Sequence, residues 1–337
     1  MRHFLMVVMI GLLLFSPISS ALSQQTEPES KEPEENPATA SPLLNWAATT
    51  FELSAGYRTD NLNWNIAGNL QGQNPTVRSE LKWSGVRIYQ FNLSNRTVIK
   101  DRFYIRGNLN YGTVASGDNR DSDYDGDGRT LEFSRSTNSV DGNSVWDGSI
   151  GIGLSFAFFD GTLAVNPLVG YAVSEQDLNI VDGYQALSSS PDTPPVGPIA
   201  NLDSRYETHW EGPWIGVDLM LSIPCKEGSF TRIGILLSGE VHWNDYDAEA
   251  NWNLRDEYRH PVSFIHEAEG NGYRVGVRML FEMKSRWGIN AGMNMQEMTT
   301  DPGLDRIFYA DGTTADTRLN EVQWRSFTFD AGVSYRF

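Results

Sequence analysis

The sequence is poor in the residues and motifs on which several protein classes depend. Among its 337 residues it has one cysteine, Cys225, and five histidines, so an internal disulfide framework is excluded. It contains no phosphate-binding glycine loop, nucleophile elbow or zinc-ligand spacing. Its one long apolar run, Phe4 to Phe15, is shorter than the roughly 20 residues that cross a membrane as a helix. A helical membrane protein is therefore excluded.

Residues 1–23 predict a secretory signal peptide. Arg2 precedes the apolar run, and the small residues Ala21 and Ser23 offer cleavage sites. Residues 24–50 follow as an acidic, proline-rich linker whose first part has too little apolar surface to fold. We expect the mature chain to function outside the cytoplasm, with this linker in the periplasm.

Composition and charge favour a membrane β-barrel. The formal net charge of −17 argues against nucleic acid as a partner and fits a carboxylate-rich surface that cations could bridge. The chain has 31 Gly, 10 Trp, 13 Tyr and 16 Phe, yet its mean hydropathy is −0.38. An aromatic, glycine-rich and mildly polar chain behind a signal peptide is typical of a barrel whose polar and apolar residues alternate.

Alternation with period two predicts an all-β fold, a closed antiparallel transmembrane barrel of about ten strands that occupies residues 51–337. We expect lipid to contact Phe103, Ile152, Ile235, Val277 and Phe329. Short turns alternate with long polar loops, as in barrels with turns in the periplasm and loops outside the cell. The expected strands lie near 51–66, 77–94, 102–115, 145–159, 163–180, 208–223, 230–247, 264–283, 287–299 and 321–337.

A barrel of this size has a narrow lumen, which disfavours an open pore. Charged residues on the inward-facing positions are expected to pair inside it, namely Arg106, Asp218, Glu240, Arg278 and Asp330. Clustered tryptophans fit an aromatic girdle at the membrane interfaces better than a carbohydrate site. The girdle would contain Trp83, Trp210, Trp214, Trp243, Trp287 and Trp324.

An acidic segment after the third strand matches the spacing of a calcium-binding loop. Asp121, Asp123 and Asp125 alternate before Gly126, and Glu132 follows Asp121 by eleven residues. Carboxylates at this spacing can surround one Ca²⁺. Gly128 stands where such loops have an aliphatic residue, and the flanking segments have the pattern of strands. A bound Ca²⁺ and a solvated acidic loop both stay open.

The same segment carries a family resemblance that spans roughly residues 51–337. The motifs Gly117-Asp118-Asn119, Asp121-x-Asp123 and the closing Tyr335-Arg336-Phe337 resemble those of the omptins and the Protochlamydia-type outer-membrane proteins. The terminal strand ending in Phe337 is similar to the signal that outer-membrane proteins present to their assembly machinery. The resemblance implies a monomer in the outer membrane, in contact with lipopolysaccharide, with its loops facing the cell exterior.

Omptins are surface endoproteases that cleave between basic residues, and by motif their aspartate pair corresponds to Asp121 and Asp123. The resemblance also implies an Asp-x-His on the rim of the strand at 230–247, but residues 243–252 contain no histidine. When the tryptophans of this strand are matched to the omptin pattern, Ala250 and Trp252 occupy the positions of the missing Asp and His. The nearest substitute, Glu240 and His242, lies roughly 20 Å lower, where we expect a buried ion pair.

A proteolytic mechanism therefore lacks its base. His260 and His266 follow the same strand, but nothing in their spacing requires them to reach the aspartates. We expect a loop tip outside the membrane to be hydrated, so that both carboxyls are ionised with pKa values near 4 and neither accepts a proton efficiently. We therefore expect a non-proteolytic surface binding or envelope protein. The alternatives are an endopeptidase that uses Asp121 and Asp123 with another base, and an adhesin stabilised by Ca²⁺.

Overall fold

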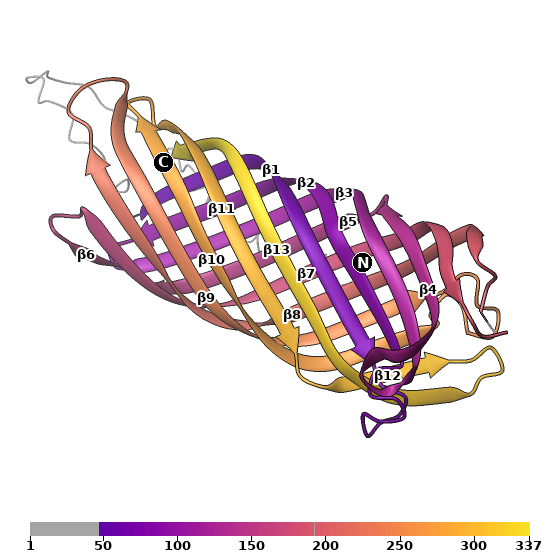
Figure 1. Cartoon of the computed structure of the whole chain (residues 1–337). Coiled ribbons are helices and arrows are strands. Elements are labelled where there is room, and N and C mark those ends of the chain that lie inside the picture. The colour runs from indigo at the N-terminus through magenta and orange to yellow at the C-terminus, as the bar shows by residue number, and fades with distance from the viewer. Residues whose placement is uncertain (1–46, 192) are drawn as a thin grey trace, which may run out of the picture. The chain divides into compact units, whose positions relative to one another are not determined.

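The computed structural model describes residues 47–191 and 193–337. This part is one antiparallel sheet of 13 strands that closes where β1 pairs with β13 (Figure 1). The predicted signal peptide lies outside the described residues, as does the linker up to residue 46. The elements are β1 (Ala47–Ile66), β2 (Ser79–Ile99), β3 (Phe103–Gly126), the 3-10 helix η1 (Asp127–Arg129), β4 (Thr130–Asp141), β5 (Ser144–Leu154), β6 (Phe156–Phe158), β7 (Leu163–Ser188), β8 (Gly197–Pro224), β9 (Phe230–Asn251), β10 (Phe264–Met283), β11 (Trp287–Thr300), β12 (Gly303–Phe308) and β13 (Thr314–Arg336).

The sheet forms a ring of about ten strands, which confirms the predicted fold. The number is smaller than 13 because short strands share one position in the ring. β4, β5 and β6 each pair with β7, and β11 and β12 both lie between β10 and β13. No helix of the described residues is long and apolar enough to span a membrane.

The predicted outward face is confirmed. Phe103, Ile152, Val277 and Phe329 are exposed on the outside of the barrel. Ile235 is half-buried and pairs with Met279, which is exposed. Similar apolar side chains from every position of the ring form a continuous lipid-facing belt, among them Leu53, Phe91, Ile150, Val169, Ile215, Val241, Val275, Ile289 and Val333.

Several strands continue far beyond this belt. The residues expected to form a long polar loop after residue 115 instead form the end of β3, η1 and β4, which pair as a hairpin. β7 and β8 extend in the same way to Ser188 and from Gly197. Strand pairing satisfies the backbone N–H and C=O groups of these segments. The expectation of a loop was wrong because alternation weakens where neither face contacts lipid.

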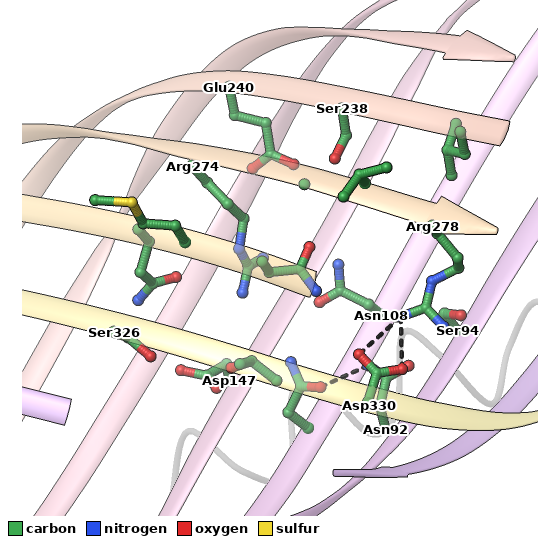
Figure 2. A pocket seen from close by; sticks show the side chains of 18 of the residues that line it. Asn92, Ser94, Asn108, Asp147, Ser238, Glu240, Arg274, Arg278, Ser326 and Asp330 are labelled. Carbon is green, nitrogen blue, oxygen red and sulfur yellow. Dashed lines mark hydrogen bonds and ion pairs between the residues drawn. The ribbon is translucent and has the colours of Figure 1, made fainter. Parts of the chain in front are cut away.

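Charged side chains fill the lumen at the level of the belt, as predicted. Arg106 lies 2.6 Å from Asp218 and 2.5 Å from Glu240. Arg278 reaches Asp330 at 2.7 Å over Gly292 of the intervening strand β11 (Figure 2). Arg106, Glu240, Arg278 and Asp330 are among the side chains that line a cavity of about 100 Å³. Because Arg106 and Arg278 are matched by carboxylates, this part of the interior is a paired polar core rather than an open pore.

Toward the ends of the long hairpins, aromatic side chains fill the lumen. Trp83 stacks on Tyr206 with ring centroids 5.1 Å apart, and Trp210 contacts Trp324 at 6.2 Å. The predicted girdle is therefore wrong for these three tryptophans, which are buried inside the barrel. Trp243 and Trp287 are exposed on the belt, as predicted.

Trp214 is also buried inside rather than in a girdle. Its indole lies over Gly151 and Gly170, where an added Cβ would come within 2.4 and 2.3 Å of the ring. The two glycines therefore provide the space that this side chain occupies. This arrangement involves three neighbouring strands, so the alternation of residues in any one strand does not predict it.

Candidate functional site

A cavity of about 630 Å³ lies between the extended parts of β3, β4, β7 and β8 and the segment that follows β9. We call it the loop-end cavity. Its walls include Asp121 and Asp123 from β3, Ser134 from β4, and Trp252 and Arg255 from the segment after β9. Apolar side chains form part of its lining, including Leu81, Ile180, Ile199 and Leu202.

A β-bulge directs the aspartate pair into this cavity. In the lower part of β3, even-numbered residues such as Arg106 face the lumen. The pairing of β2 with β3 shifts between Ile88–Val114 and Arg87–Ser116, so one residue is inserted. Beyond the bulge odd-numbered residues face inward, and Asp121 and Asp123 share this face because they are two residues apart.

The two carboxyls have no basic partner in direct contact. Within residues 47–191 and 193–337 neither Asp121 nor Asp123 forms an ion pair, and Oδ1 of Asp121 has no hydrogen-bond partner. Asp123 accepts hydrogen bonds from Ser79 and Ser134. Burial raises the pKa of Asp121 well above its usual value, and the charge of Asp123 adds to this effect. Burial also raises the pKa of Asp123.

The expected position of this pair at a loop tip was therefore wrong. Both residues lie in a strand and line a cavity instead of a loop tip. A carboxyl with a raised pKa can hold a proton at a pH where an exposed aspartate cannot. The pair is thus chemically different from the ionised loop-tip carboxyls that we expected from the sequence.

Another part of the cavity lining comes from the segment after β9. Trp252 lies there, as the tryptophan matching predicted, while Ala250 is buried in the aromatic core. Arg255 also lines the cavity, and its Nη1 lies 3.2 Å from Oε1 of Glu257. Sequence reasoning missed Arg255 and Glu257, because this irregular segment has no periodicity that assigns its side chains to a face.

No histidine or cysteine is among the described residues that line this cavity. His260 is exposed and its Nδ1 lies 2.8 Å from Oδ1 of Asn251. His266 is fully buried in the aromatic core and does not line the cavity. His242 lies in the lumen with Nε2 2.9 Å from Oε2 of Glu240, so the predicted buried pair is present.

The four predicted calcium ligands do not converge. Asp121 and Asp123 face the cavity, whereas Asp125 pairs with Arg78 and Glu132 pairs with Arg135. The part of the chain that the structure describes contains no group of three or more histidine, cysteine, aspartate or glutamate side chains placed to hold a metal. Calcium binding stays a prediction.

The fold is similar to solved outer-membrane proteins. The outer membrane protease OmpT from Escherichia coli matches with a TM-score of 0.68 and 14% identity, over 86% of this chain and 97% of that chain. The translocator domain of the autotransporter NalP from Neisseria meningitidis matches with a TM-score of 0.33 and 9% identity, over 86% of this chain and 88% of that chain. At 14% identity the likeness to OmpT concerns the fold alone.

No curated protein matches the chain. The model of one family, described as Protochlamydia outer membrane protein (Pom), matches residues 52–337. This range covers the barrel from the first lipid-facing strand to the terminal phenylalanine. The chain therefore belongs to the Pom family of omptin-like outer-membrane β-barrels.

Proposed function

We propose that this barrel is a non-proteolytic binding protein of the bacterial surface, with the loop-end cavity facing the cell exterior. The observation that carries the proposal is the pair Asp121 and Asp123. Both line a cavity of about 630 Å³ without an ion-pair partner among the described residues. Two carboxyls that lack a counter-charge favour a ligand with an ammonium or guanidinium group.

The setting that we propose is a monomer surrounded by lipopolysaccharide. Pairing of β1 with β13 leaves no open sheet edge that would require a partner. The exposed apolar belt supplies the surface that lipid chains would contact.

Calorimetry of the purified barrel in lipopolysaccharide-containing micelles, titrated with Nα-acetyl-lysine amide, tests the proposal. We expect binding that weakens about tenfold when both carboxyls are neutralised by Asp121→Asn and Asp123→Asn, since about 1.4 kcal/mol is a factor of ten. Asp125→Asn is the matched control, because Asp125 pairs with Arg78 and is not part of the cavity lining. No binding to the unmodified barrel, or an equal loss in the control, would contradict the proposal.

A surface endopeptidase is the second candidate, and one observation favours it. The raised pKa of Asp121 gives the cavity a carboxyl that can exchange a proton. A peptide library incubated with the barrel distinguishes the two candidates. Cleavage that disappears in Asp121→Asn would replace the binding function by the endopeptidase.

A further inference from the structure

The lining of the loop-end cavity carries opposite charges. Asp121 and Asp123 belong to β3, whereas Arg255 belongs to the segment after β9. Arg255 is near enough for its charge to lower the pKa of both carboxyls. It forms no ion pair with either of them in the described structure, where its salt-bridge partner is Glu257. Two separate parts of the chain thus supply opposite charges to one cavity.

Arg255 is held in place but remains available to a ligand. Its backbone N–H donates to the carbonyl of Trp252 at 3.0 Å, and its own carbonyl accepts from the N–H of Tyr258 at 2.9 Å. These bonds form tight turns that position the residue. Glu257 engages one guanidinium nitrogen and is itself 51% exposed, so water screens this contact. A guanidinium has five N–H donors, which leaves others free for a planar carboxylate.

We propose that the loop-end cavity selects ligands that carry a cationic group and a carboxylate together, with the cation against Asp121 and Asp123 and the carboxylate against Arg255. This inference rests on the proposed function and names its ligand class. A ligand with a cation alone is attracted by the carboxyls but repelled by Arg255. A carboxylate on the same ligand turns that repulsion into attraction. Short peptides with a basic side chain next to a carboxylate have this chemistry.

Calorimetry with three probes tests this inference on the full barrel in lipopolysaccharide-containing micelles. Nα-acetyl-Lys-Gly carries an ammonium and a terminal carboxylate, and its C-terminal amide carries the ammonium alone. Nα-acetyl-Lys-Asp amide carries the carboxylate on a side chain, which distinguishes recognition of a chain end from recognition of an acidic residue. We expect at least one carboxylate probe to bind the unmodified barrel about threefold to fivefold tighter than the amide, as for a partly exposed charge pair.

Variants of Arg255 test whether its charge causes the preference for the carboxylate probes. Arg255→Gln should bring the probes within about twofold of one another and strengthen binding of the amide, whereas Arg255→Lys should keep part of the preference. Arg259→Gln is the matched control, because Arg259 lies in the same segment but stacks on Phe308 with its guanidinium carbon 3.9 Å from the ring centroid. Circular dichroism confirms that each variant folds.

Three results would overturn the inference. If the amide binds the unmodified barrel as tightly as both carboxylate probes, the selectivity is absent while the proposed function stands. If Arg259→Gln removes the preference as fully as Arg255→Gln, overall charge is responsible. If no probe binds the unmodified barrel, the proposed function fails and this inference fails with it.

Discussion

Nε2 of His266 lies 3.2 Å from Oδ1 of Asp305, and both side chains are buried. Nδ1 of the same ring lies 2.8 Å from the hydroxyl of Tyr206, which in turn lies 2.6 Å from that of Tyr246. This chain of polar contacts joins β8, β9, β10 and β12 inside the aromatic core. His266 is thereby assigned to the core and not to the wall of the loop-end cavity.

Asp305→Ala should destabilise the barrel strongly. Asp305 accepts a hydrogen bond from the hydroxyl of Thr317 and lies close to His266, so its removal leaves buried polar groups without compensation, which costs about 1 to 3 kcal/mol. Denaturant unfolding in micelles, followed by tryptophan fluorescence, measures the loss. Asp311→Ala is the control, because Asp311 is fully exposed and bonds only within its own turn. A loss below about 1 kcal/mol for Asp305→Ala would contradict the role assigned to the pair.

Asp121→Asn should stabilise the barrel at neutral pH and not in acid. Burial raises the pKa of Asp121 in the folded state. The protonated side chain therefore contributes fully to stability below the ordinary pKa near 4, and this contribution is lost as the pH rises through the pKa of the folded state. The variant never carries this charge, so its advantage should grow as the pH rises above about 4. Unfolding midpoints at a series of pH values measure it. An advantage that is constant with pH would refute the explanation.

The unmodified barrel should not cleave dibasic peptides above background. The described lining of the loop-end cavity offers no imidazole to accept a proton from water. Trp252→His adds an imidazole to the lining that contains the aspartates and should produce weak cleavage. Ala250→Asp is a poorer addition, because Ala250 is 2% exposed and a carboxylate there would be buried in the aromatic core. Fluorogenic peptide assays measure both, and cleavage by the unmodified barrel that Asp121→Ala abolishes would contradict this prediction.

Calcium should bind weakly, with a dissociation constant on the order of 1 mM or higher. Asp125 and Glu132 are already neutralised by Arg78 and Arg135. Arg78→Gln combined with Arg135→Gln frees both carboxylates and should strengthen uptake, as measured by calorimetry. If uptake is micromolar in the unmodified barrel and disappears in Asp123→Ala, the four predicted ligands do rearrange around the ion.

The sequence by itself determined the class of fold and which side chains of the membrane strands lie on the outer face. Period-two alternation is a local property, so residues such as Phe103, Val277 and Phe329 could be assigned to the outer face from their own strands. The pairing of Arg106 and Arg278 with carboxylates followed as well, because charges on the inner face of a narrow barrel have few other partners.

Only the tertiary structure decided what lies beyond the belt. The bulge near Val114 turns Asp121 and Asp123 inward, and a single inserted residue of this kind leaves no mark in the alternation. Trp214 is buried because glycines on two other strands leave room for it. Arg255 lines the same cavity as the two aspartates, although it is more than 100 residues away from them in the sequence. Such contacts depend on strand register and on irregular segments together, and neither is encoded in the pattern of one strand.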